Sequence, residues 1–335
     1  MHVLVTGGAG FIGSFTSDLL IKSGHKVTII DNLSTGHLST IPAGAQFFQA
    51  DITDYSSMLK IFLKEKFDGL IHFAAKSLVG ESVQFPLKYY ENNFLGTLNL
   101  VKACKETAVT SIVFSSTAAV YGEPTQDLNE EHPKNPINPY GNSKLAVENL
   151  IKDVALSSEN STKLHCIALR YFNACGGHQE GEMGEDHEPE THLIPLVVGA
   201  ALGKRPALQI FGNDYPTADG TAVRDYIDVR DLADAHLLAL MRCSEQNSDT
   251  AYFEAFNVGT GLGNSVAEVI AAAEKVLKIK VPHQIGPRRP GDPAKLVANS
   301  LKIQSELTWK AKTTLEDSID AVFKFQTKYP QGYSK

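Results

Sequence analysis

The sequence has few cysteines, a single tryptophan and no apolar run long enough to cross a membrane. Its 335 residues include four cysteines, Cys104, Cys166, Cys175 and Cys243, with no Cys-x-x-Cys pair among them. This pattern argues against a disulfide or zinc framework, because such frameworks use closely spaced cysteines. Since no membrane-spanning run or signal sequence precedes the first expected strand at His2, we expect a soluble, cytoplasmic protein with reduced thiols.

Basic residues are missing from one segment. The chain has 31 basic and 38 acidic side chains, a net charge of −7, and no lysine or arginine between Arg170 and Lys204. Six acids from Glu180 to Glu190 account for nearly all of the negative excess. The overall balance argues against a polybasic nucleic-acid or membrane binder, and a hydrophobic content of 43% argues against general disorder.

The acidic segment also carries histidines, at positions 178, 187 and 192. Their spacing matches no helical zinc-binding motif. We therefore interpret the segment as a solvated loop beside a substrate pocket and assign no metal to it.

Short apolar runs alternate with longer helical patterns through the first half of the chain. The apolar runs are Val3–Val5, Val27–Ile30, Phe47–Gln49, Leu70–Phe73, Ile112–Ser115 and Leu164–Leu169. The helical patterns between them are Ile12–Ser23, Tyr55–Lys64, a long helix ending near Lys105, and Tyr140–Val154. This alternation predicts an α/β fold with a doubly wound parallel sheet of the Rossmann type.

After Arg170 the pattern becomes less regular. Helices are predicted over Leu196–Leu202, Leu232–Met241, Val266–Val276 and Leu315–Lys328, between loops and short extended pieces. We therefore expect a Rossmann domain over residues 1–172 and a smaller mixed α/β substrate-binding domain over residues 173–335. The chain is expected to return to the first domain around residues 224–245.

A glycine-rich turn follows the first expected strand and opens the first helix. Gly7, Gly10 and Gly13 are spaced as G-x-x-G-x-x-G, which permits a tight turn, close approach of a pyrophosphate and close helix packing. The helix N-terminus would stabilise the phosphates. An ordinary glycine turn is the alternative, but the strand–turn–helix context favours a dinucleotide site.

Two acidic residues follow later strands. Asp31 ends the second strand, where a carboxylate can accept hydrogen bonds from an adenosine ribose and repel a 2′-phosphate, which favours NAD over NADP. A solvated turn aspartate is the alternative. Asp51 and Ile52 follow the third strand and are expected to flank the adenine, although Asp51 is equally suited to cap the next helix.

Tyr140 and Lys144 form a Tyr-x-x-x-Lys pair on one face of an expected helix. An ammonium near a phenol favours the phenolate, so we expect a lowered Tyr140 pKa that suits tyrosine to general-base work. Thr117, at a strand end, would hydrogen-bond the substrate oxygen. The pair alone is also compatible with a chance arrangement on a surface helix. No G-x-S-x-G elbow supports a serine hydrolase.

Taken together, these motifs resemble the extended short-chain dehydrogenase/reductase family and, within it, the UDP-glucose 4-epimerases. The resemblance runs from end to end through residues 5–13, 72–75, 79–82, 89–93, 140–144, 170–173, 210–215, 220–226, 257–261 and 288–292. It implies an isomerase of galactose metabolism that interconverts UDP-galactose and UDP-glucose with tightly bound NAD. Tyr140 would remove the 4-OH proton while hydride leaves C4, and hydride would return to the other face of the 4-keto sugar.

The resemblance also implies a set of binding residues. The cofactor would contact Gly7, Gly10, Phe11, Ile12, Gly13, Asp31, Asn32, Asp51, Ile52, Phe73, Ala74, Ala75, Asn92, Tyr140, Lys144 and Phe172. The UDP-sugar would contact Thr117, Asn173, His192, Leu193, Gln209, Ile210, Phe211, Arg224, Arg289, Asp292 and Leu296. The two arginines suit a diphosphate, which they can bind bidentately, although either alone could be a surface ion pair. A homodimer through helices near Leu87–Lys105 and Tyr140–Val154 is implied as well, with no nucleic-acid or membrane partner.

Departures from the family pattern leave some points open. Thr117 stands where serine is common, His192 where asparagine is common, and Ser77 where some members have lysine. Leu296 does not decide whether UDP-N-acetylhexosamines or UDP-pentoses are also used. Related dehydratases and decarboxylases need a carboxylate after the catalytic hydroxyl, where this chain has alanines at positions 118 and 119. A dehydrogenase that releases NADH and a catalytically silent NAD-binding protein are the remaining alternatives.

Overall fold

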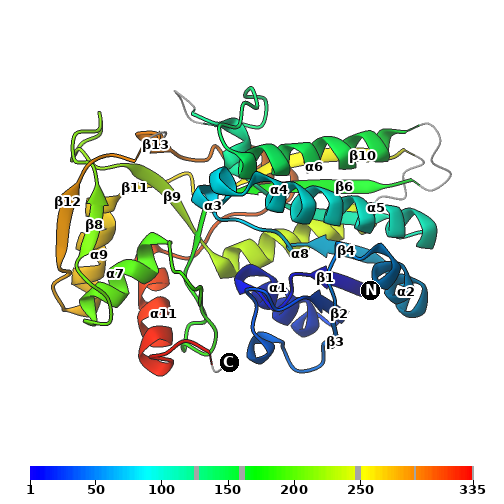
Figure 1. Ribbon diagram of the computed structural model, residues 1–335, viewed down its shortest axis with the longest axis horizontal. Coiled ribbons are helices and arrows are strands. Elements are labelled where there is room, and N and C mark those ends of the chain that lie inside the picture. Colours follow the sequence, from blue (N-terminus) through cyan, green and yellow to red (C-terminus); the bar gives the residue numbers. More distant parts are fainter. Residues whose placement is uncertain (124–127, 158–162, 246–249, 290–291, 334–335) are drawn as a thin grey trace.

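A seven-stranded, all-parallel sheet forms the larger part of the molecule (Figure 1). The computed structural model describes residues 1–123, 128–157, 163–245, 250–289 and 292–333. Its strand order is β10-β6-β5-β4-β1-β2-β3. The strands are β1 (His2–Thr6), β2 (Lys26–Asp31), β3 (Gln46–Gln49), β4 (Gly69–His72), β5 (Ser111–Thr117), β6 (His165–Tyr171) and β10 (Tyr252–Val258). The predicted doubly wound Rossmann-type fold is confirmed.

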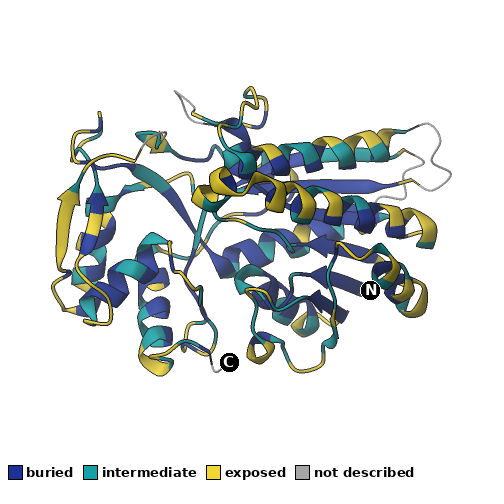
Figure 2. Ribbon diagram, viewed as in Figure 1, coloured by how far each residue is buried: buried dark blue, intermediate teal, exposed yellow. Residues whose placement is uncertain are grey.

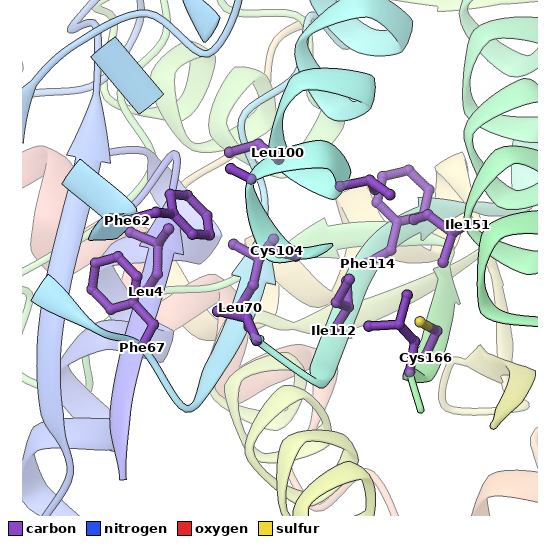
Figure 3. Packing of buried hydrophobic residues seen from close by; sticks show 14 of the residues in the cluster. Leu4, Phe62, Phe67, Leu70, Leu100, Cys104, Ile112, Phe114, Ile151 and Cys166 are labelled. Atoms are coloured by element: carbon purple, nitrogen blue, oxygen red, sulfur yellow. The ribbon is translucent and has the colours of Figure 1, made fainter. Parts of the chain in front are cut away.

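Helices cover both faces of this sheet, because its strands carry apolar side chains on each face. Leu4 packs with α2 (Tyr55–Glu65), α5 (Gly96–Thr107) and α6 (Pro139–Leu156), whereas its neighbours Val3 and Val5 pack with α1 (Phe11–Lys22) and α8 (Val229–Glu245). Figure 3 shows the first of these layers, in which Leu70 and Ile112 from the strands meet helical side chains. Alternation along a strand thus produces two cores.

A second lobe lies beside the sheet, at the left of Figure 1. Its strands are β7 (Asn173–Cys175), β8 (Leu208–Phe211), β9 (Val223–Asp228), β11 (Gly263–Ser265), β12 (His283–Gly286) and β13 (Lys295–Leu296). Its helices α7 (Leu193–Ala201), α9 (Val266–Leu277) and α11 (Leu315–Lys328) enclose a third core built around Val197, Val269 and Ile319. Short elements complete the chain: η1 (Leu38–Thr40), η3 (Ala118–Tyr121) and α10 (Leu301–Glu306).

The predicted long helix ending near Lys105 is wrong in its continuity. The segment consists of α3 (Val79–Gln84), α4 (Pro86–Tyr89), the π-helical η2 (Tyr90–Leu95) and then α5. Phe85 leaves the helical region, with φ −130° and ψ 61°, because a residue that precedes proline is disfavoured there. The π-helical turn brings Asn92 to the cavity described below, which is a common setting for such turns.

The predicted helix over Leu315–Lys328 is confirmed at both ends. At its N-terminus the hydroxyl of Thr314 and the side chain of Asp317 form a capping box. The helix predicted from Leu196 begins earlier, at Leu193, because Pro195 is tolerated in a first turn. Among the described residues we find no helix with the length and apolar character needed to cross a lipid bilayer.

Candidate active site

A cavity of about 390 Å³ opens where the parallel strands end and the second lobe begins. Ligands of doubly wound folds bind at this edge of the sheet. Of the predicted cofactor residues, those that line the cavity are Gly7, Gly10, Phe11, Ile12, Gly13, Asp31, Asn32, Ile52, Phe73, Ala74, Ala75, Asn92, Tyr140, Lys144 and Phe172. Of the predicted substrate residues, Thr117, Asn173, His192 and Leu296 line it as well.

The glycine turn leaves no room for side chains. Gly7 has φ +74°, and a Cβ there would lie 2.6 Å from the Ala74 nitrogen. A Cβ on Gly13 would lie 2.1 Å from the carbonyl oxygen of Gly7. Helix α1 begins just after Gly10 with no side-chain cap and no acidic residue in its first turn. Its first amide groups are therefore suited to an anion such as a pyrophosphate.

Asp31 is held at the cavity wall by the backbone. Its carboxylate accepts hydrogen bonds from the amides of Ala9, at 3.1 Å, and Leu33, at 2.8 Å. Burial raises its pKa, and these hydrogen bonds partly offset that effect. The carboxylate thus occupies the position expected for a ribose acceptor.

Asp51 does not line the cavity, although Ile52 does. Its carboxylate accepts hydrogen bonds from Thr53 and from the side-chain amide of Asn32, the latter at 2.8 Å. The helix cap that Asp51 was suited to provide comes instead from Asp54, which accepts from the Ser57 amide at 3.1 Å.

Lys76 is a cavity residue that the sequence analysis missed. Its ammonium donates to the Ser34 hydroxyl at 3.2 Å, and both residues line the cavity. This lysine is adjacent to Ser77, where some family members carry a lysine. A lysine one residue before position 77 could therefore have predicted this cavity residue from the sequence.

Tyr140 and Lys144 lie within the first two turns of α6. The helix begins with Pro139, and the Asn138 side chain caps it by accepting from the Gly141 amide at 2.9 Å. The Lys144 ammonium donates to the Ser115 carbonyl at 2.8 Å. Burial removes water from the ammonium and lowers the lysine pKa to about 7.

The predicted lowering of the Tyr140 pKa is not found in the chain without cofactor or substrate. Burial raises the pKa of this phenol, and a hydrogen bond with Thr117 offsets the rise only in part. Burial is therefore the dominant influence on this phenol. The Lys144 ammonium is directed to the Ser115 carbonyl and lies 4.8 Å from the centre of the Phe114 ring.

Thr117 is the last residue of β5 and the N-cap of η3. Its hydroxyl oxygen accepts a hydrogen bond from the Ala119 amide at 3.1 Å, so its own proton is left for another acceptor. Ala118 and Ala119 both line the cavity, and neither can move a proton. The position that a dehydratase or decarboxylase would fill with a carboxylate is therefore apolar.

A buried ion pair supports this strand end. Arg170 donates to Glu148 through two nitrogens, at 2.9 and 2.6 Å, and the Ser116 hydroxyl donates to the same carboxylate at 2.5 Å. Residue 116 immediately precedes Thr117, so this contact connects α6 and β6 to the strand end that carries the hydroxyl.

The other predicted UDP residues lie in the second lobe and do not line the cavity. Arg224 contacts the Asp292 carboxylate, and the Arg289 guanidinium lies 3.8 Å from the centre of the Phe211 ring. Arg224 pairs in register with Leu296, which reaches the cavity. Gln209 and Ile210 belong to β8, and Leu193 opens α7. Residues 290 and 291 of the 288–292 motif lie outside the described residues.

The segment interpreted as a solvated loop is partly buried. Glu185 is 5% exposed and Glu190 is 9% exposed. One oxygen of Glu185 lies 3.1 Å from His187 Nδ1 and also contacts His192 Nδ1. Paired histidines make this burial of acids possible, and sequence spacing alone does not show such pairing.

Comparison with known proteins connects this arrangement to a family. The family profile described as GDP-mannose 4,6 dehydratase matches residues 4–322. The chain is 45% identical to the UDP-glucose 4-epimerase of Lacticaseibacillus casei over 99% of each protein. A crystal structure of a UDP-glucose 4-epimerase is 42% identical, with a TM-score of 0.94 and complete coverage of both chains. The UDP-glucose-4-epimerase of Stenotrophomonas maltophila, solved with bound NAD and formylated UDP-arabinopyranose, is 39% identical over 99% of each chain, with a TM-score of 0.93.

These relatives match over their full length, and the cavity carries the glycine turn together with the hydroxyl, phenol and ammonium groups expected from the sequence. The profile is described by a dehydratase, whereas the full-length relatives named above are epimerases. The chain belongs to the UDP-glucose 4-epimerase family of the extended short-chain dehydrogenases/reductases.

Proposed function

We propose that this chain is an NAD-dependent UDP-glucose 4-epimerase that interconverts UDP-galactose and UDP-glucose. One observation carries the proposal: a glycine turn with no space for side chains and the Thr117, Tyr140 and Lys144 side chains line a single cavity. The family membership and the NAD-bound relative support the same cofactor for this chain.

We assign the proton transfer to Tyr140, which would take the proton of the sugar 4-hydroxyl and later return it. The Thr117 hydroxyl accepts from the Ala119 amide and hydrogen-bonds with the Tyr140 phenol, and it would donate to the reacting oxygen when the sugar is bound. Lys144 lies one turn from the phenol and would hold the nicotinamide ribose. NAD, when bound, supplies the reversible hydride acceptor that a 4-keto intermediate requires. Since burial raises the Tyr140 pKa, a positive charge added near the phenol would favour its basic form.

The residues of the second lobe suit the UDP group. We propose that Arg224 and Arg289 anchor the diphosphate and that Asp292 lies near the uridine ribose, with the 209–211 strand beside them. Residues 1–172 would then hold the cofactor and residues 173–335 the UDP-sugar. Tight binding of the UDP group and weak binding of the hexose would allow the 4-keto sugar to rotate in the site between the two hydride transfers.

Other reactions and other substrates have less support than epimerisation of a UDP-hexose. A dehydratase or decarboxylase would need an acid or base at position 118 or 119, and both residues are alanine. A UDP-pentose remains a second candidate substrate, because Leu296 lines the cavity and one solved relative holds a UDP-arabinopyranose derivative. A side-by-side assay of hexose, N-acetylhexosamine and pentose UDP-sugars tests this range.

The main test is conversion of UDP-galactose to UDP-glucose by purified protein without added reductant. We expect the wild type to epimerise the sugar with no net release of NADH. Tyr140→Phe should retain NAD and lose most turnover. Tyr55→Phe, whose phenol is on the surface of α2, should turn over as the wild type does. Absence of conversion with NAD bound would overturn the assignment. Near-normal turnover of Tyr140→Phe would instead remove this residue as the base.

We further propose that the protein acts as a homodimer in the cytoplasm. Exposed apolar residues gather along the segment from α3 through α4 to η2 that contacts α6, among them Val83, Phe85 and Leu87. Figure 2 shows many exposed residues along these helices. A second copy of the same face would cover them. The four cysteines are free and buried, which is in keeping with a reducing compartment.

A further inference from the structure

Two carboxylates and two imidazoles converge between β7 and α7. Glu185, His187, Glu190 and His192 each offer one ligand atom, and these atoms all lie within 4.8 Å of one another. With metal–ligand bonds of about 2.0–2.1 Å, the atoms around a tetrahedral zinc ion stand ~3.3 Å apart. The distances in the cluster bracket this spacing, so an ion would draw the most widely separated atoms together and would open the contact between Glu185 and His192.

The carboxylate of Glu185 supplies an independent observation. Its side chain is 1% exposed, and its Oε1 atom lies 3.1 Å from His187 Nδ1 and contacts His192 Nδ1. The Oε2 atom of the same carboxylate is buried, yet it has no hydrogen-bond partner in the part of the chain that the structure describes. A buried carboxylate oxygen of this kind normally has a hydrogen-bond partner or a metal ion. An ion at the centre of the cluster would provide that partner.

The charges and donor atoms of the cluster suit a divalent cation. In the described residues, the ion pairs of Glu185 and Glu190 are with His187 and His192, and no lysine or arginine occurs in the sequence between Arg170 and Lys204. Two carboxylates and two neutral imidazoles would neutralise a doubly charged ion. Nitrogen and oxygen donors in a set of four are typical of zinc and similar first-row metals.

We propose that Glu185, His187, Glu190 and His192 form a binding site for a divalent transition-metal ion of the Zn²⁺ class. The site lies in the wall between two cavities. Glu185, His187 and His192 line the cavity described above, whereas Glu185, His187 and Glu190 also line a second cavity of about 400 Å³ next to α11. An ion would hold this wall of the proposed active site in one conformation and would reach it from the second cavity. The metal site itself does not depend on the proposed reaction.

Cobalt provides the test, because tetrahedral Co²⁺ absorbs visible light intensely and Zn²⁺ displaces it. Full-length protein stripped with a chelator is titrated with Co²⁺ and then with Zn²⁺, and bound metal is counted by mass spectrometry. We expect one ion per chain, intense cobalt bands and their loss on addition of zinc. His187→Ala and the nearly isosteric Glu190→Gln should each weaken binding about 10-fold or more. His178→Ala, in the same segment but outside the cluster, should bind as the wild type does.

Circular dichroism of the metal-free variants separates lost ligands from lost folding. If the wild type takes up no ion, or if His187→Ala and His178→Ala bind equally well, the proposal is overturned and the four residues form only an ion-pair cluster. X-ray absorption of the zinc-loaded wild type gives an answer that needs no variant. Two imidazole ligands would support the site, and a shell of oxygens alone or of thiolates would overturn it.

Discussion

The Lys144 ammonium donates a hydrogen bond of 2.8 Å to the carbonyl oxygen of Ser115. This bond ties α6 to the end of β5, two residues before Thr117. It therefore sets the position of the hydroxyl relative to Tyr140, which lies one helical turn before the lysine. The lysine is 3% exposed, so its charge is held in a largely dry site.

This buried charge leads to a prediction for Lys144→Met. Burial lowers the lysine pKa from 10.5 to about 7, so between these values the unfolded chain binds the proton more tightly than the folded chain. The contribution of Lys144 to stability is thus unfavourable at pH 7 and improves as the pH rises towards 10.5. We expect Lys144→Met to lose most turnover. In urea unfolding of NAD-free protein at pH 7 it should be at least as stable as the wild type. Its free energy of unfolding should lack the increase that Lys144 gives the wild type as the pH rises towards 10.5. A destabilised variant that keeps its activity would contradict this account.

Gly13→Ala is expected to lose NAD and stability together. The added Cβ would lie 2.1 Å from the Gly7 carbonyl oxygen. Such overpacking costs about 1–3 kcal/mol, which exceeds the gain of about 1 kcal/mol expected from alanine in a helix. Gly80→Ala is the matched control, because a Cβ on this helical glycine meets no atom within 4 Å. Bound NAD and denaturant unfolding are the measurements, and equal behaviour of the two variants would refute the steric argument.

Glu148→Gln is expected to destabilise the protein strongly. It would leave the Arg170 guanidinium, whose side chain is 2% exposed, without its anionic partner. Breaking a buried ion pair on one side costs about 3–5 kcal/mol. Asp18→Asn, which breaks a surface pair between a half-buried carboxylate and the exposed Lys22, should change stability by less than about 1 kcal/mol. Urea unfolding compares the two, and a similarly small loss for both would show that burial of the Glu148 pair is unimportant.

Leu87→Lys is expected to separate the proposed homodimer. Leu87 is 74% exposed on α4, and a charge there would be buried in a symmetric interface. Leu301→Lys, at a residue that is 67% exposed on α10, serves as the control. Light scattering should give a dimer mass for the wild type and the control, and a monomer mass for Leu87→Lys. A wild-type monomer at micromolar concentration would refute the dimer.

Local patterns were enough to predict most of the sheet and the glycine turn. The apolar run Val3–Val5 followed by Gly7, Gly10 and Gly13 predicted a strand, a turn and a helix, and these are β1, the turn and α1. The helical pattern over Leu315–Lys328 predicted the bounds of α11. In both cases the determining interactions lie within a few residues, so the sequence pattern contains them.

Contacts between distant residues were not predictable in this way. Lys76 meets Ser34 across 42 residues, and the Asp51 carboxylate accepts from Asn32 across 19. The partner of each side chain depends on which strands become neighbours. The raised pKa of Tyr140 likewise depends on burial, which no spacing of tyrosine and lysine records.

The sequence by itself determined the parallel α/β fold, the strand–turn–helix unit and the residue types available for proton transfer, because these depend on short-range periodicity and glycine spacing. Only the tertiary structure decided that Thr117, Tyr140 and Lys144 line the same cavity as the glycine turn. It also decided that the acids around Glu185 are buried with histidines. The physical reason is that desolvation and pairing of charges arise from packing, and packing brings together segments that are far apart in the chain.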